Sequence, residues 1–167
     1  MAVLPEFLAT NESYAATFTK GDLPMPPGRK VAVLVCMDAR IDPAKALGLE
    51  EGDAHVIRNA GGLAAEAIRS LAISQELLGT REIVVIHHTD CGMLTFTDDV
   101  IRQRLTESLG PEAGALAAGM DFLPFSDVEE SVRNDLAALK SSPLIRPGTP
   151  IAGFVYDVAT GRLSAVE

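Results

Sequence analysis

Residues 31–40 of this chain read Val-Ala-Val-Leu-Val-Cys-Met-Asp-Ala-Arg. The first six form a continuous apolar run bounded by polar residues, which is typical of a strand buried on both faces, as in a parallel sheet. In open α/β sheets, ligands bind outside the carboxyl ends of the strands. Asp38 and Arg40 follow this strand directly, so the stretch predicts both the sheet and the edge of the sheet where chemistry is expected.

Further strands and helices alternate along the rest of the chain. We expect strands over residues 54–58, 83–87, 151–157 and 163–166, helices over 42–48, 64–78 and 127–139 and from Thr97 onward, and a loop over 110–124. This alternation predicts the α/β class, with a mainly parallel central sheet flanked by helices. The length of 167 residues suits one compact domain, so we expect a single domain over residues 1–167.

The amino-terminal part of the chain differs from the rest. Apolar side chains recur at roughly helical spacing between Glu6 and Lys20, and the stiff segment Leu23-Pro-Met-Pro-Pro27 follows. We expect residues 1–27 to form a helical arm and a linker. Such an arm is suited to embrace a neighbouring subunit.

Composition and charge exclude several classes of partner. Apolar residues make up 47% of the chain and charged residues 22%, which is typical of a folded globular protein. The formal net charge is −9, and no run of Lys or Arg could follow a phosphate backbone. We therefore expect no nucleic-acid partner. Anionic membrane surfaces are also disfavoured, and no apolar stretch approaches the ~20 residues that span a bilayer.

The two cysteines and the first residues bear on the compartment. Two cysteines are too few for a disulfide scaffold, and in a reducing compartment they would persist as thiols or metal ligands. The segment Met1–Phe7 has no basic residues before an apolar run, and Glu6 falls where the apolar core of a signal peptide would lie. We expect a cytoplasmic protein.

Metal-ligand chemistry is indicated at the ends of two predicted strands. Cys36 ends the first, and the sequence His88-Thr-Asp-Cys91 follows the third. The spacing His-x-x-Cys suits one metal-binding turn, and Cys36 would add a third soft ligand from the neighbouring loop. Structural zinc is usually held by four protein ligands, whereas catalytic zinc keeps a position open, and Cys₂His is among the catalytic sets. The candidates for the fourth position are Asp38, His55, His87 and Asp90.

The pattern Cys-x-Asp-x-Arg followed by His-x-x-Cys resembles the signature of the β-carbonic anhydrase family, and here it stands as Cys36-Met-Asp38-Ala-Arg40 and His88-Thr-Asp-Cys91. The resemblance extends over nearly the whole chain. Further segments similar to the family are Arg58-Asn-Ala-Gly61, Ser142-Pro-Leu-Ile145, Gly153-Phe-Val-Tyr-Asp157 and Thr160-Gly161. Each motif alone is weak, but the combined pattern is specific.

The resemblance implies a function and a set of roles. Zinc would be held by Cys36, His88 and Cys91, and a zinc-bound hydroxide would hydrate carbon dioxide reversibly to bicarbonate. Asp38 and Arg40 would be the catalytic pair beside the metal, with Asp38 orienting the hydroxide and Arg40 holding Asp38 by a bidentate ion pair. If this pair breaks, Asp38 can bind the zinc and close the site. The family also implies a homodimer or a larger homo-oligomer.

Competing interpretations remain at this stage. Carbon disulfide or carbonyl sulfide would suit the same hydroxide, so a hydrolase of these molecules is an alternative function. A second alternative is a non-enzymatic zinc or redox sensor, which would not need a carboxylate beside an open metal position. Asp38 and Arg40 could also be a plain surface ion pair, worth little to stability. We expect His87 to point away from His88, and we expect a structural role for His55.

Overall fold

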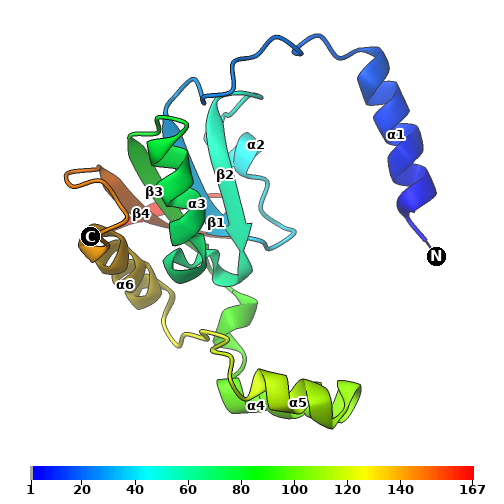
Figure 1. Ribbon diagram of the computed structural model, residues 1–167, viewed down its shortest axis with the longest axis vertical. Helices are drawn as coiled ribbons and strands as arrows, with labels where there is room; N and C mark the ends of the chain where they lie inside the picture. Colours follow the sequence, from blue (N-terminus) through cyan, green and yellow to red (C-terminus); the bar gives the residue numbers. More distant parts are fainter. Residues whose placement is uncertain (1) are drawn as a thin grey trace.

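The computed structural model describes residues 2–167, and Figure 1 shows a central sheet with helices packed against it, while the first helix and a pair of helices in the second half of the chain lie away from the sheet. The five strands lie in the order β2-β1-β3-β4-β5. Their bounds are β1 (Val31–Cys36), β2 (Ala54–Asn59), β3 (Glu82–His88), β4 (Ile151–Tyr156) and β5 (Leu163–Val166). Neighbours among the first four strands run parallel, and β5 is antiparallel to β4. The predicted mainly parallel α/β sheet is confirmed.

Residues 2–167 also form six α-helices and two short 3-10 helices. They are α1 (Leu4–Ala16), α2 (Pro43–Leu47), η1 (Ala60–Gly62), α3 (Ala64–Glu76), η2 (Gly92–Leu94), α4 (Asp98–Leu109), α5 (Pro111–Ala117) and α6 (Val128–Ser141). Several begin at the expected cap: Asp42 accepts from the backbone N–H of Lys45, and Thr97 accepts from that of Val100. Local capping chemistry thus sets these helix starts.

The core has two parts because the side chains of a strand alternate between the faces of the sheet. On one face, Leu34 and Ile83 pack in the same buried cluster as Leu71 of α3 and Leu139 of α6. All four of these side chains are 0% exposed. Full burial of one such side chain contributes about 1.5–3 kcal/mol. The opposite face carries a second cluster, which includes Val35, Cys36 and Cys91 and therefore continues into the candidate site.

One expected loop is a helix. The sequence analysis treats residues 110–124 as a loop, but α5 spans Pro111–Ala117, so this expectation is wrong for the first half of the segment. Proline at the first helical position and Glu112 in the first turn favour a helix start, and alanines continue it. Gly114 lets α5 lie close to α4, since a Cβ there would press on the Thr106 side chain.

Helix α1 has no buried residue, and Figure 1 shows it joined to the sheet domain by a long connection. Its exposed apolar side chains are Leu4, Phe7, Leu8 and Tyr14. A helix that leaves this much apolar surface uncovered is unusual for an isolated chain. No helix within residues 2–167 has the length and apolar character that crossing a bilayer requires.

Candidate metal centre

Strand pairing brings the two ligand-bearing segments together. β1 and β3 are parallel neighbours, with Val35 opposite Ile86, so both strands end at the same edge of the sheet. There one ligand atom from each of Cys36, His88 and Cys91 lies within 4.8 Å of the other two, and all three residues are buried. The structure therefore gathers the three residues that the sequence analysis selects.

The His88 ring shows that this group is suited to a metal ion. Its Nδ1 lies 2.8 Å from the carbonyl oxygen of Thr89, which can only accept, so Nδ1 carries the proton. Nε2 is therefore left with a free lone pair, and it is buried without a hydrogen-bond partner. Leaving a buried polar atom unpaired is costly. A metal ion would use this lone pair, and one imidazole with two thiolates is a known ligand set for zinc with an open fourth position.

The two sulfur atoms share a proton in a way that favours cation binding. A hydrogen bond with the Cys91 side chain lowers the pKa of Cys36 to about 4, although burial opposes this effect. Hydrogen bonds from the backbone N–H groups of Asp38 and Gly61 act in the same direction. The pKa of Cys91 is raised in turn, first because its thiol donates to Cys36. One sulfur is thus a ready thiolate, and a bound cation would release the remaining proton.

The predicted ion pair between Asp38 and Arg40 is bidentate. Arg40 Nε donates to Asp38 Oδ1 at 2.9 Å and Nη2 donates to Oδ2 at 2.8 Å. These hydrogen bonds hold the pKa of the Asp38 carboxyl well below its usual range. Asp38 Oδ2 also lies 3.8 Å from His88 Nε2, so the carboxylate is fixed beside the metal group. The geometry is that of a positioned acceptor rather than a loose surface pair.

Asp90 has a role that the sequence analysis does not find. Arg40 Nη1 donates to Asp90 Oδ2 at 2.7 Å, and Nη2 donates to the Asp90 carbonyl oxygen at 2.9 Å. The backbone of Asp90 has a φ of 54°, a left-handed conformation that Asp tolerates better than most residues. Arg40 thereby joins the loop after β1 to the loop after β3. Asp90 is a candidate metal ligand in the sequence analysis, but its carboxylate is paired with Arg40.

The turn after β2 brings main chain against the site, as its glycines indicate. Gly62 has a φ of 74°, and a Cβ there would lie 2.8 Å from the backbone nitrogen of Cys36. Asn59 stabilises the turn, because its side chain donates to the carbonyl oxygen of Leu63 and accepts from the Leu63 N–H. Only a glycine can therefore occupy position 62 without moving the Cys36 loop.

The other two histidines, His55 and His87, are not part of the group formed by Cys36, His88 and Cys91, as expected. His87 points to the opposite face of the sheet, where its Nε2 lies 3.1 Å from Asp135 Oδ2 and its ring packs on Phe125 at a centroid distance of 5.6 Å. His55 Nδ1 lies 2.7 Å from Ser74 Oγ. One nitrogen of each ring therefore has a structural partner, while His87 Nδ1 is buried without a hydrogen-bond partner on the face away from the two cysteines.

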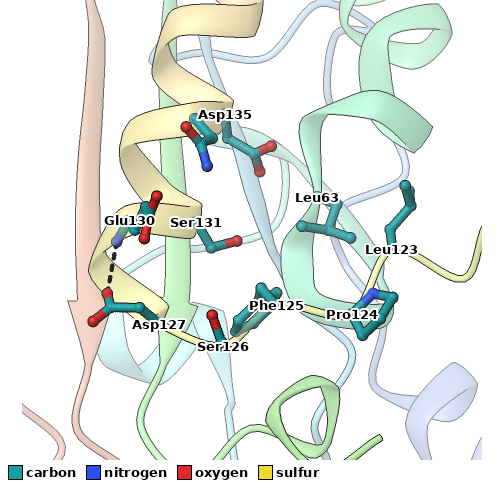
Figure 2. A pocket seen from close by; sticks show the side chains of 10 residues that line it. Leu63, Leu123, Pro124, Phe125, Ser126, Asp127, Glu130, Ser131 and Asp135 are labelled. Atoms are coloured by element: carbon teal, nitrogen blue, oxygen red, sulfur yellow. Dashed lines mark hydrogen bonds between the residues drawn. The ribbon is translucent and has the colours of Figure 1, made fainter. Parts of the chain in front are cut away.

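Two cavities are candidates for the functional site, and they differ in the residues that line them. A cavity of about 160 Å³ lies at the site, and its lining residues are Cys36, Met37, Asp38, Ala60, Gly61, His88, Cys91, Gly92 and Met93. A larger cavity of about 390 Å³ lies between the start of α3, the loop before α6 and α6 itself. Figure 2 shows this larger cavity, with Leu63, Phe125 and Asp135 around it and Asp127 capping α6. Its lining contains neither cysteine nor histidine, so the donor atoms identify the smaller cavity as the candidate site.

Comparisons with known proteins identify the family of the chain. The family model described as carbonic anhydrase matches residues 31–163. The chain is 47% identical to beta-carbonic anhydrase 1 of Mycobacterium tuberculosis, covering 99% of both chains, and 35% identical to a carbon disulfide hydrolase of Acidianus sp., covering 91% of this chain and 83% of that relative. A solved carbonic anhydrase from Glaciozyma antarctica is 53% identical and superposes with a TM-score of 0.95 over 100% of both chains. The chain therefore belongs to the β-carbonic anhydrase family.

Proposed function

We propose that this protein catalyses the reversible hydration of carbon dioxide to bicarbonate, with zinc held by Cys36, His88 and Cys91. The observation that carries the proposal is the buried, unpaired Nε2 of His88, which lies with two sulfur ligands inside 4.8 Å and beside the Asp38 carboxylate. Bound zinc would lower the pKa of a water at the open position, so that this water could ionise to hydroxide, which is a strong nucleophile.

The protein's own residues supply orientation and a small apolar chamber. Asp38 is anionic and can only accept hydrogen bonds, so it fixes the attacking water through one of the water's protons. Arg40 keeps the carboxylate charged and in place through the two hydrogen bonds to its oxygens. Met37, Ala60 and Met93 contribute apolar wall to the cavity of about 160 Å³, which suits a small linear molecule without charge.

The ion pair between Asp38 and Arg40 also decides whether the fourth ligand position of the zinc stays open. Of the candidates to fill it, His55, His87 and Asp90 have other partners. Asp38 is the carboxylate nearest to His88, with 3.8 Å between its Oδ2 and Nε2. We infer that Arg40 keeps Asp38 from binding the metal. Loss of Arg40 would free the carboxylate to close the site.

We also propose that the protein works as a homodimer or a larger homo-oligomer in the cytoplasm. Phe7 and Leu8 of α1 are 63% and 58% exposed, and β2 is an edge strand that carries Val56 at 42% exposure. A second copy of the chain would cover these surfaces. The free thiols of Cys36 and Cys91 suit a reducing compartment.

A hydrolase of carbon disulfide is the second candidate function, and the 35% identity to the Acidianus enzyme is the observation that favours it. Carbon disulfide is also linear and uncharged, so the same nucleophile and the same Asp38 would serve. Rates measured side by side with carbon dioxide and carbon disulfide on one zinc-loaded preparation distinguish the two. We expect hydration of carbon dioxide to dominate. A higher kcat/KM for carbon disulfide would assign the chain to the second function.

The ligand set is tested by zinc content. Cys36→Ser, His88→Ala and Cys91→Ser should each lose most of the metal, because only two protein ligands remain. His55→Ala is the matched control, since His55 is bonded to Ser74 and should leave about one zinc per chain. Full zinc occupancy in any of the first three variants would show that the ligand set is wrong.

A further inference from the structure

The guanidinium group of Arg58, at the end of β2, lies against the main chain of the metal-ligand loop. Nε and Nη2 donate to the carbonyl oxygen of Cys36 at 3.1 and 2.9 Å, and Nη2 also donates to the carbonyl oxygen of Asp38 at 2.7 Å. One side chain thus holds two carbonyl groups, two residues apart, on the loop that carries both a candidate zinc ligand and the carboxylate beside the metal.

Fixing these carbonyls determines where the loop directs its other polar groups. The backbone N–H of Asp38 faces the Cys36 sulfur, and the backbone N–H of Arg40 donates to Asp38 Oδ1 at 2.8 Å. The Asp38 carbonyl oxygen also accepts from the N–H of Ile41 at 3.1 Å. The two carbonyl groups that Arg58 holds belong to the planar peptide units 36–37 and 38–39. These units lie on either side of the unit that carries the Asp38 N–H, and the second precedes the unit that carries the Arg40 N–H, so holding them restricts where both N–H groups point. The position of the Asp38 carboxylate therefore depends on the groups that hold the loop.

Arginine is suited to this contact for a reason of geometry. Its guanidinium is planar and carries its donors in a rigid fork, so two acceptors can be held at a fixed separation. Hydrogen bonds from a charged donor are also stronger than neutral ones. Lysine would keep the charge and could bond to one carbonyl, but it has no rigid fork with which to fix the separation of the two.

We infer that Arg58 is a positioning residue for carbon dioxide hydration: it sets the conformation of residues 36–38, and thereby the orientation of Asp38 and of the Cys36 sulfur toward the metal. This inference rests on the proposed function. Arg58 does not line the cavity at the metal group, so it acts through the loop and not on the substrate.

The test compares Arg58→Met with Arg102→Met. Methionine keeps much of the aliphatic stem and removes the fork in both cases. Arg102 is a matched control, because it too holds two carbonyl groups, that of Ala117 at the end of α5 at 3.2 Å and that of Met120 just beyond it at 2.7 Å, and none of these residues lines the cavity at the candidate site. Zinc content, melting temperature and carbon dioxide hydration are measured for both variants, together with the visible absorption spectrum after cobalt replaces zinc. That spectrum reports the ligand geometry without reference to activity.

We expect Arg58→Met to retain about one metal ion per chain, to lose hydration about 10–100-fold and to show an altered cobalt spectrum. Arg102→Met should keep the wild-type hydration rate and spectrum, even where its melting temperature falls equally. A wild-type rate and spectrum in Arg58→Met would overturn the inference. Equal losses of hydration rate in Arg58→Met and Arg102→Met would also overturn it, because they would show a general effect of reduced stability.

A conservative variant covers the case in which Arg58→Met does not fold. Arg58→Lys keeps the charge and one donor, so its hydration rate should lie below the wild type and its cobalt spectrum should shift. A full wild-type rate and spectrum in Arg58→Lys would show that the fork is not needed. Failure of the proposed function gives a different result: the zinc-loaded wild-type protein would itself not hydrate carbon dioxide, whereas the cobalt spectra would still report the effect of Arg58 on the site.

Discussion

At the scale of single residues, contacts between near neighbours could be predicted from the sequence and contacts across loops could not. Asp38 and Arg40 are two residues apart, so an ion pair between them is geometrically available in most loop conformations. The contact between Arg40 and Asp90 spans 50 positions and needs the parallel pairing of β1 with β3. Arg58 is similar, since its contact with Cys36 spans 22 positions. A guanidinium that binds carbonyl oxygens leaves no pattern in the sequence.

The residue scale also carries the test of the ion pair. Arg40→Ala should retain zinc, because no ligand is lost, but hydration should fall about 10–100-fold, as is usual when a partner that orients a metal-site group is removed. Asp38→Ala should also be slow. The variants should differ in thiocyanate binding, because freed Asp38 can block the metal only in Arg40→Ala. Stopped-flow hydration and thiocyanate titration measure both effects.

Arg29→Ala is the control for this pair of variants, since Arg29 forms an ion pair with Asp53 at 3.1 Å away from the metal loops. It should match the wild type in hydration rate and in anion affinity. If Arg40→Ala also matches the wild type in both, the Asp38 pair is a surface salt bridge, and the proposed roles of both residues fail.

At the scale of elements, the strands and most helices could be predicted because their signals are local. The buried strand 31–36 is continuously apolar, and Asp42 and Thr97 carry cap signals that the structure confirms. The segment 110–124 carries two opposing local signals. Its three glycines favour a loop, whereas Pro111, Glu112 and the alanines that follow favour the helix α5 that forms. Gly114 also lets α5 lie close to α4.

The turn formed by η1 offers a test at this scale. Gly62→Ala and Gly79→Ala both place a side chain at a positive φ, 74° and 73°, and left-handed backbone costs roughly 1–2 kcal/mol per residue with a Cβ. Gly79 has no atom within 4 Å of the added Cβ, whereas Gly62 faces the Cys36 backbone at 2.8 Å. We expect the larger loss of unfolding free energy, and weaker zinc binding, in Gly62→Ala. Urea unfolding measures the free energy of unfolding, and chelator competition measures the affinity for zinc. Equal values of both quantities in the two variants would contradict this account of the turn.

At the scale of the whole molecule, the fold brings together what the sequence separates. Cys36 and Cys91 come from different loops, and their convergence follows from the parallel order of β1 and β3. This convergence could be anticipated, because carboxyl ends of parallel strands share one edge. The helical spacing near the amino terminus predicts the arm that contains α1, but it does not predict which surface covers the apolar side chains of this helix, none of which is buried.

The proposed role of α1 in contacts between subunits is tested by measuring how the protein assembles. Phe7→Glu places a charge where a second copy would cover an apolar ring, and losing the burial of one large side chain is worth about 1.5–3 kcal/mol. That corresponds to roughly a tenfold or greater increase in the dissociation constant of the assembly. Sedimentation velocity over a range of concentrations measures it, with Glu12→Gln as a control on the same helix. Wild-type protein that remains monomeric, or Phe7→Glu that assembles like the wild type, would contradict the proposed role of the arm.

The central claim is that the Cys36, His88 and Cys91 group holds a catalytic zinc ion, and removal and return of the metal tests it most directly. The wild-type protein is treated with pyridine-2,6-dicarboxylate, freed of the chelator, and assayed for carbon dioxide hydration by stopped flow before and after zinc is added. We predict that hydration falls to the uncatalysed rate and returns when about one zinc per chain is added. Metal-free protein that hydrates carbon dioxide at the full rate would contradict the account.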